Sequence, residues 1–314
     1  MLLPSAIFML LVPPVTTAPP ITAIAFSPGD KTVVVGSQTG LEIFAWPELV
    51  PMRKLETKLL NIHDLAFSPN GELLAACGGE PGTNGQVELF EWPDGKRVGV
   101  WHGHDDVVYS VAWSSESCLL AAASADHQVS VSRIERKGDS TKITPELILS
   151  GHSRGVLTVA ILPNDGFVLS AGIDQSLRVW QLNNGKLRRT LDQHKAAVHA
   201  LEVRPNVDPQ QPMIASASAD KTVRLWQPKI GRLVRFAQLP VEPLDIAWTP
   251  SGDRLLASCK DGKLRAINPE TVEIVTTHSA IDGWAYSVAV ARSGKHALVG
   301  GSEGQLNTIE LTAE

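Results

Sequence analysis

The sequence has few cysteines, no block of positive charge and no apolar run long enough to cross a membrane. Its three cysteines, Cys77, Cys118 and Cys259, lie inside apolar runs and show no Cys-x-x-Cys spacing. We therefore expect buried thiols rather than disulfides or a metal site. Lysine and arginine number 28 against 33 acidic residues, and no basic stretch stands out. An electrostatic footprint for nucleic acid is therefore not expected.

Motifs for chemistry are also missing. No Gly-x-Ser-x-Gly nucleophile turn and no glycine loop that could cradle a phosphate occur in the chain. We accordingly expect no catalytic residue, no metal ion and no cofactor. A content of 43% hydrophobic and 19% charged residues nevertheless predicts a folded protein with a sizeable core.

The first twenty residues allow two interpretations. Residues 5–12, SAIFMLLV, form a short apolar run that is followed by PPVTTAPP, as in a secretory signal peptide. No lysine or arginine precedes the run, which speaks against a signal peptide. The run is too short for a membrane-spanning helix. On this pattern we favour an exported or periplasmic protein over a cytoplasmic one.

The rest of the chain is an internal repeat. Seven related units follow one another from residue 21, and their equivalent turn residues Asp126, Asp174, Asp220 and Asp261 are 48, 46 and 41 residues apart. Each unit contains short β-branched runs such as VLTVAIL and FVLSAG, separated by turn signals such as Pro-Asn-Asp-Gly. No segment of a dozen residues has a helical period of apolar positions. The sequence therefore predicts an all-β protein made of propeller blades.

The units resemble those of the WD-repeat β-propeller family in a degenerate form, because none of them carries the Trp-Asp dipeptide. The resemblance covers residues 21 to about 311 and implies a seven-bladed propeller of four-stranded antiparallel blades. In the family, a His before the blade, a Ser or Thr on its second strand, an Asp in the next turn and a Trp on its third strand form a hydrogen-bonded tetrad. The matching residues here are His152, Ser170, Asp174 and Trp180 in blade 4, and His194, Ser216, Asp220 and Trp226 in blade 5.

The resemblance also gives the N-terminus its second interpretation. Family members complete the last blade with a strand from the start of the chain, and residues 8–12 fall where that strand would lie. Residues 1–20 are therefore either a signal peptide or the strand that closes the ring, and residues 21–314 form the propeller. Cleavage would leave the last blade with an unpaired edge.

For function, the resemblance favours a non-catalytic scaffold, expected to be a monomeric propeller, that binds another protein. Family members commonly bind at the narrow face, where the loops that lead into the blades and the starts of the inner strands surround the channel. Tyr109 and its equivalents Thr22, His63, Leu157, His199, Leu244 and Tyr286 occupy these strand starts. Longer loops add Trp284 before blade 7 and residues 80–84 in blade 2. The expected interaction surface consists of His63, Glu80, Asn84, Tyr109, His199, Trp284 and Tyr286.

A propeller enzyme is the alternative. A lactonase-like hydrolase or a quinoprotein-like dehydrogenase would need acidic and histidine side chains that converge at the channel. The inner-strand starts offer His63, Asp64, His199 and Asp245 for such a site. Fold alone does not decide between the two functions.

Overall fold

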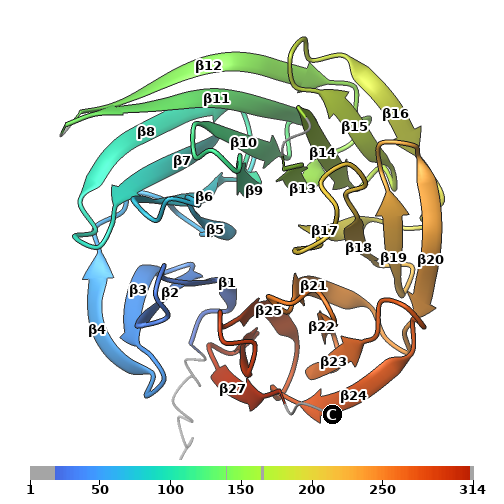
Figure 1. Cartoon of the computed structure of the whole chain (residues 1–314). Coiled ribbons are helices and arrows are strands. Elements are labelled where there is room, and N and C mark those ends of the chain that lie inside the picture. The colour runs from blue at the N-terminus through green and yellow to red at the C-terminus, as the bar shows by residue number, and fades with distance from the viewer. Residues whose placement is uncertain (1–17, 139, 164–165, 312–314) are drawn as a thin grey trace, which may run out of the picture.

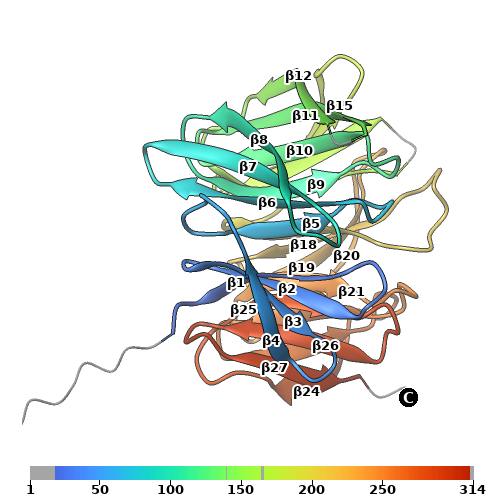
Figure 2. The ribbon, with the colours of Figure 1, turned by 90° about the vertical axis from the view of Figure 1, so that its left-hand side faces the viewer.

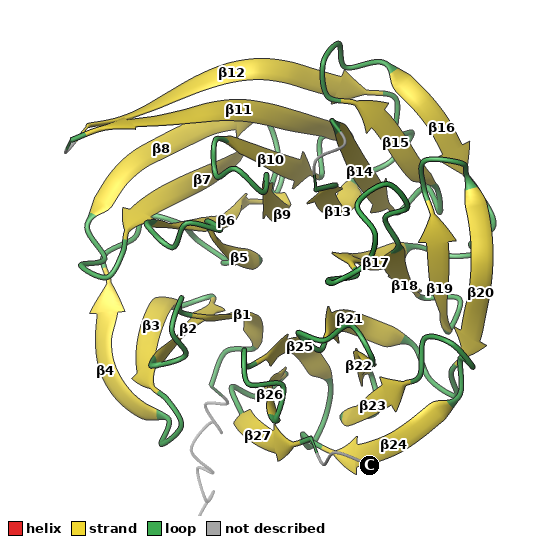
Figure 3. Ribbon diagram, in the orientation of Figure 1, coloured by secondary structure: helices red, strands yellow, loops and turns green. Residues whose placement is uncertain are grey.

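The computed structural model describes residues 18–138, 140–163 and 166–311, which form seven antiparallel sheets arranged in a ring. All the regular elements in these ranges are strands, drawn in yellow in Figure 3. Six sheets have four strands, and the seventh has three within the described residues. The all-β fold and the seven-bladed propeller predicted from the repeats are confirmed. No helix among the described residues is long and apolar enough to cross a membrane.

The strands of each blade run between the two faces of the ring (Figure 2). The inner strands, which line the channel, are β1 (Ile21–Phe26), β5 (Asp64–Phe67), β9 (Val108–Trp113), β13 (Val156–Ile161), β17 (Val198–Val203), β21 (Pro243–Trp248) and β25 (Ala285–Val290). The second strands are β2 (Thr32–Ser37), β6 (Leu73–Glu80), β10 (Leu119–Ser124), β14 (Phe167–Gly172), β18 (Ile214–Ser218), β22 (Leu255–Cys259) and β26 (His296–Gly301).

The outer half of each blade is less buried. The third strands are β3 (Gly40–Ala45), β7 (Asn84–Glu91), β11 (Gln128–Lys137), β15 (Leu177–Gln181), β19 (Thr222–Gln227), β23 (Lys263–Ile267) and β27 (Leu306–Glu310). The outermost strands are β4 (Val50–Leu55), β8 (Arg97–His104), β12 (Ser140–Ser150), β16 (Leu187–Leu191), β20 (Arg232–Gln238) and β24 (Ile274–Ser279).

The second strands are apolar along nearly their whole length. β10, with the sequence LLAAAS, and β18, with IASAS, are buried at every residue. Neighbouring blades cover both faces of these strands, so the alternation typical of half-exposed strands is absent. Small residues predominate because the blades approach one another closely towards the axis of the ring.

The hydrophobic core is divided among the seven interfaces between blades, with one cluster at each. The interface between blades 7 and 1 closes the ring, and its cluster contains Ile21, Val33, Val35 and Leu298. Each such buried side chain contributes about 1.5–3 kcal/mol relative to exposure. Packing of β1 and β2 against β26 therefore stabilises closure by several kcal/mol. Residues 8–12, expected either to complete blade 7 or to be cleaved, lie outside the described residues.

Candidate functional site

At the narrow face, each inner strand presents one residue that stands outside the regular pairing. In six blades a β-bulge interrupts the inner strand at this residue. In blade 2 it is the residue directly before β5. A bulge redirects a side chain, and bulges are common beside binding sites. These half-buried residues form what we call the mouth ring: Thr22, His63, Tyr109, Leu157, His199, Leu244 and Tyr286.

One side of the mouth ring is formed by blades 2 and 3. The rings of His63 and Tyr109 meet edge to face, with centroids 4.9 Å apart. Burial lowers the pKa of His63 to about 4, so this imidazole is neutral at physiological pH. Beside them, the β6–β7 hairpin ends in the exposed Glu80 and Asn84. The hairpin tip is held in place because the Gly82 N–H donates to Asp106 Oδ1, in the loop before β9, at 2.8 Å.

Blades 5, 6 and 7 contribute a continuous row of side chains, which we call the rim chain: His199, Glu242, Lys260, Trp284 and Tyr286. His199 Nε2 and Glu242 Oε1 are 3.0 Å apart, and Lys260 Nζ lies 2.8 Å from Glu242 Oε2. The same ammonium group lies 4.8 Å from the centroid of the Trp284 ring, which contacts the Tyr286 ring at 5.8 Å. The Trp284 indole remains 44% exposed.

Electrostatics hold the rim chain together. Burial by itself would raise the pKa of Glu242, but hydrogen bonds from Lys260 and His199 bring it below its ordinary value. The carboxylate therefore stays ionised and fixes the lysine over the indole face, where a cation is attracted by the ring.

In four blades, the residue after the mouth-ring position ties its blade to the following one. A side-chain oxygen at this position accepts a hydrogen bond from a backbone N–H of the next inner strand. The bonds run from the Val111 N–H to Asp64 Oδ2 (3.0 Å), from Val159 to Ser110 Oγ (3.4 Å), from Leu201 to Thr158 Oγ1 (3.0 Å) and from Val288 to Asp245 Oδ2 (2.9 Å).

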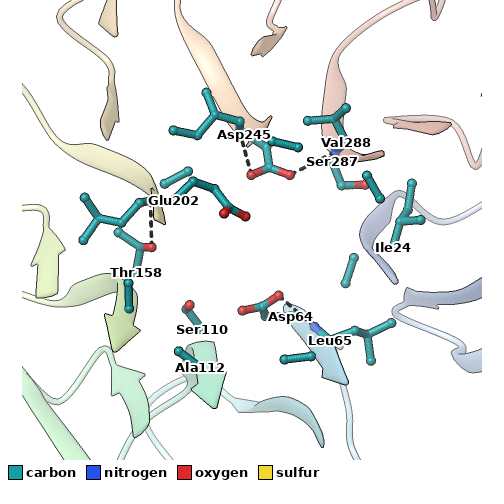
Figure 4. A pocket seen from close by; sticks show the side chains of 18 of the residues that line it. Ile24, Asp64, Leu65, Ser110, Ala112, Thr158, Glu202, Asp245, Ser287 and Val288 are labelled. Atoms are coloured by element: carbon teal, nitrogen blue, oxygen red, sulfur yellow. Dashed lines mark hydrogen bonds between the residues drawn. The ribbon is translucent and has the colours of Figure 1, made fainter. Parts of the chain in front are cut away.

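Two of these residues are aspartates, and in both cases the preceding blade has alanine at the equivalent position. Ala23 precedes Asp64 around the ring, and Ala200 precedes Asp245. Alanine cannot accept a hydrogen bond, so the second aspartate oxygen takes the N–H of its own neighbour, at 2.8 Å in both blades. Burial raises the pKa of Asp64 to about 6 and that of Asp245 to about 7. Figure 4 shows both carboxyl groups at the channel wall.

The residues considered for an enzyme site do not converge. His63 and Asp64 belong to blade 2, His199 to blade 5 and Asp245 to blade 6. Across the described ranges, no group of three or more His, Cys, Asp or Glu side chains is arranged to hold a metal ion. The two aspartates accept hydrogen bonds from backbone N–H groups. These bonds explain where the aspartates lie without invoking a reaction.

The expected tetrad residues lie together inside blades 4 and 5. His152 Nδ1 is 2.8 Å from Asp174 Oδ2, and its Nε2 is 2.7 Å from Ser170 Oγ. The Trp180 indole N–H donates to the same hydroxyl at 2.8 Å. Blade 5 has the same distances for His194, Asp220, Ser216 and Trp226.

The tetrad carboxylates are strongly stabilised as anions. Burial by itself would raise the pKa of Asp220, but hydrogen bonds from Thr222, from the Lys195 N–H and from His194 bring it down to about 2. The tetrads therefore brace individual blades and lie apart from the mouth ring.

Three residues of this region were missed by reasoning from sequence: Glu242, Lys260 and Glu202. Glu242 and Lys260 lie in different turns of blade 6, and only folding brings them beside His199 and Trp284. Glu202 had a signal in the sequence, because it stands where the other six units have alanine. Figure 4 shows its side chain extending into the channel.

Known proteins share these repeats. The family described as "WD domain, G-beta repeat" matches residues 50–90, 95–131, 143–181 and 185–227, together half of the chain. WD repeat and HMG-box DNA-binding protein 1 of Xenopus laevis is 29% identical over 50% of this chain and 13% of its own length. THO complex subunit 3 of Arabidopsis thaliana is 22% identical over 68% of this chain and 65% of its own length. Nuclear distribution protein nudF 1 of Talaromyces marneffei is 27% identical over 52% of this chain and 34% of its own length.

These comparisons overturn the expected export. The relatives are eukaryotic proteins whose names refer to DNA binding, nuclear distribution and a THO complex, and none of the names refers to secretion or a periplasm. The expectation rested on a short apolar run, and such a run also suits a β-strand. The chain spans between 13% and 65% of the lengths of these three relatives.

Proposed function

Because the chain belongs to the WD-domain, G-beta repeat family, we propose that it is a non-catalytic scaffold that binds another protein through the narrow face of its propeller. The name of one relative describes a subunit of a complex, which is consistent with such a role. The partner we propose is a protein and not a nucleic acid, since the chain has a net charge of −5 and no basic patch in its sequence.

The rim chain is the observation that carries this proposal. Trp284 is a large aromatic side chain that remains substantially exposed although its ring is held by Tyr286 and Lys260. A fixed, amphipathic aromatic group loses little conformational entropy when a partner covers it. Aromatic anchors with a polar surround are typical of the few residues that dominate binding energy at interfaces.

The rest of the proposed surface lies on blades 2 and 3, which are separated from this anchor by blade 1. His63 and Tyr109 form a second aromatic pair, and Glu80 and Asn84 extend the surface outward from blade 2. A partner that spans the channel mouth would contact an aromatic group on each side. Loops and bulges at this face can vary without disturbing the packed second strands, which suits a surface that recognises one partner.

The test compares two variants of the purified chain as baits in extracts of the source organism. The double variant Trp284→Ala/Tyr286→Ala removes the anchor and is expected to weaken binding of a captured partner by about 30-fold, which corresponds to about 2 kcal/mol. Phe236→Ala is the matched control, because Phe236 is also an exposed aromatic residue under a cation, 48% exposed and 5.4 Å from Arg224, but on β20.

We expect the control to bind its partner like the unmodified chain. Circular dichroism and the melting temperature establish that each variant is folded. If the folded double variant retains full affinity while Phe236→Ala loses it, the binding surface lies on the outer strands and the proposal is wrong.

A further inference from the structure

One ring of residues in the channel wall below the mouth ring consists of alanine, with one exception. The residue three positions after each mouth-ring residue is alanine in six blades and glutamate in the fifth, in equivalent register with the second strand. This ring consists of Ala25, Ala66, Ala112, Ala160, Glu202, Ala247 and Ala289. One long acidic side chain thus projects into the channel from a ring of residues that is otherwise alanine (Figure 4).

Among the channel carboxylates of the described residues, Glu202 alone has no hydrogen-bond donor. Among the described residues, Asp64 and Asp245 each accept two backbone N–H bonds. Within the described ranges, no hydrogen bond from a side-chain or backbone donor reaches the Glu202 carboxyl group, and the residue is half-buried in the channel. Burial, with the charges of Asp245 and Asp64 acting in the same direction, raises the pKa of Glu202 to about 8. An acid with such a raised pKa and no hydrogen-bond donor is stabilised by a proton or by a nearby cation.

The channel has room for such a cation. Its volume is about 670 Å³, within the range typical of small-ligand sites. The mouth ring leads into it past His63, Tyr109 and Tyr286, whose rings can border a cation on its way in. A bare metal ion fits less well, since no three potential metal ligands among the described residues are arranged around one point.

We propose that the channel receives one cationic side chain, an arginine or lysine of the protein partner, with Glu202 as its counter-ion. The inference rests on the proposed function, because the cation is carried by a protein that docks on the narrow face. Asp64 and Asp245 remain bonded to the backbone and add negative potential around the site. Charge complementarity then selects a partner that presents a basic residue at the centre of its contact surface.

The first experiment measures this site without any natural partner. The probes are the peptide acetyl-Gly-Gly-Arg-Gly-Gly-amide and its citrulline analogue, which has the same shape and no charge. Saturation-transfer NMR on the full chain at pH 9 and low ionic strength measures the two dissociation constants. We expect the arginine peptide to bind at least tenfold more tightly than the citrulline peptide. Equal binding of the two peptides would overturn the proposal.

Variants then assign the effect to Glu202. Glu202→Ala restores the alanine found in the other six blades, so the variant is expected to fold, and Glu202→Gln keeps the shape of the side chain. Both should abolish the preference for arginine over citrulline, whereas Glu303→Gln, at an exposed turn, should preserve it. A preference that survives in folded Glu202→Ala refutes the assignment.

Two further binding measurements distinguish the proposed site from a site for free small cations and from a metal site. If n-butylguanidinium binds through Glu202 but the arginine peptide does not, the channel is a site for free small cations and the inference fails. If calcium binds with the same dependence on Glu202 and displaces the peptide, the site is a metal site and the inference also fails.

The Trp284→Ala/Tyr286→Ala variant distinguishes this inference from the proposed function. Its channel should bind the arginine peptide within about twofold of the unmodified chain, because the short probe depends on Glu202 rather than on the rim anchor. Loss of partner capture with intact peptide binding supports both conclusions. Intact partner capture contradicts the proposed function alone, and absent charge preference contradicts the channel inference alone.

Discussion

Replacing Glu202 by glutamine should stabilise the propeller at alkaline pH and change its stability little at pH 5. The pKa of this carboxyl is raised from its ordinary value of 4.5 to about 8 in the folded chain. Between these two values the folded chain holds a proton that the unfolded chain has lost. The free energy of unfolding therefore falls as pH rises from about 4.5, and the loss is complete above about 8. Glutamine does not titrate and escapes this loss.

The size of the effect follows from the same shift. One pKa unit corresponds to 1.36 kcal/mol, so a shift from 4.5 to about 8 sets an upper limit of about 5 kcal/mol. Water in the channel screens the charge, and the protonation of Asp64 and Asp245 relieves part of the repulsion. We therefore expect Glu202→Gln to gain about 2 kcal/mol over the unmodified chain at pH 9.

Urea denaturation at pH 5 and pH 9 measures this difference, with Glu303→Gln as the control for a generic loss of negative charge. The difference between Glu202→Gln and the unmodified chain should grow from near zero at pH 5 to its full value at pH 9. A difference that is the same at both pH values would refute the burial of an ionisable group at this position.

Three other predictions concern stability. Asp220→Ala should lower the free energy of unfolding by about 2–4 kcal/mol, because it leaves buried donors unpaired. Glu303→Ala should change it little, and equal shifts of the melting temperature in the two variants would contradict the tetrad. Asp245→Ala should cost about 2–3 kcal/mol in urea denaturation by leaving the Ile246 and Val288 N–H groups unpaired, and an unchanged midpoint would disprove this inter-blade bond. Because the pKa of Asp220 is lowered to about 2, its contribution is complete above about pH 4 and is lost as pH falls towards 2. Asp220→Asn should accordingly flatten the loss of stability over that range, and an unaltered acid transition would argue against an ionised Asp220.

Most of the fold could be predicted from the sequence because the chain consists of repeats. Equivalent turn residues recur at nearly regular spacing, and each unit contains its own strands, so the seven blades follow from local patterns. The tetrad residues could be named for the same reason, since His152, Ser170 and Asp174 belong to one unit. Short apolar runs are less specific, because a strand and a signal peptide both require them, and the expectation of export was wrong on that account.

The rim chain and the lining of the channel could be identified only from the tertiary structure. Glu242, Lys260 and Trp284 come from different segments, and only the packing of blade 6 against blade 7 sets them side by side. The sequence contained the alanine register that makes Glu202 exceptional, but it did not show that this register faces an open channel. The bulges and the curvature of the ring decided that, and these are properties of neighbouring blades rather than of any single repeat.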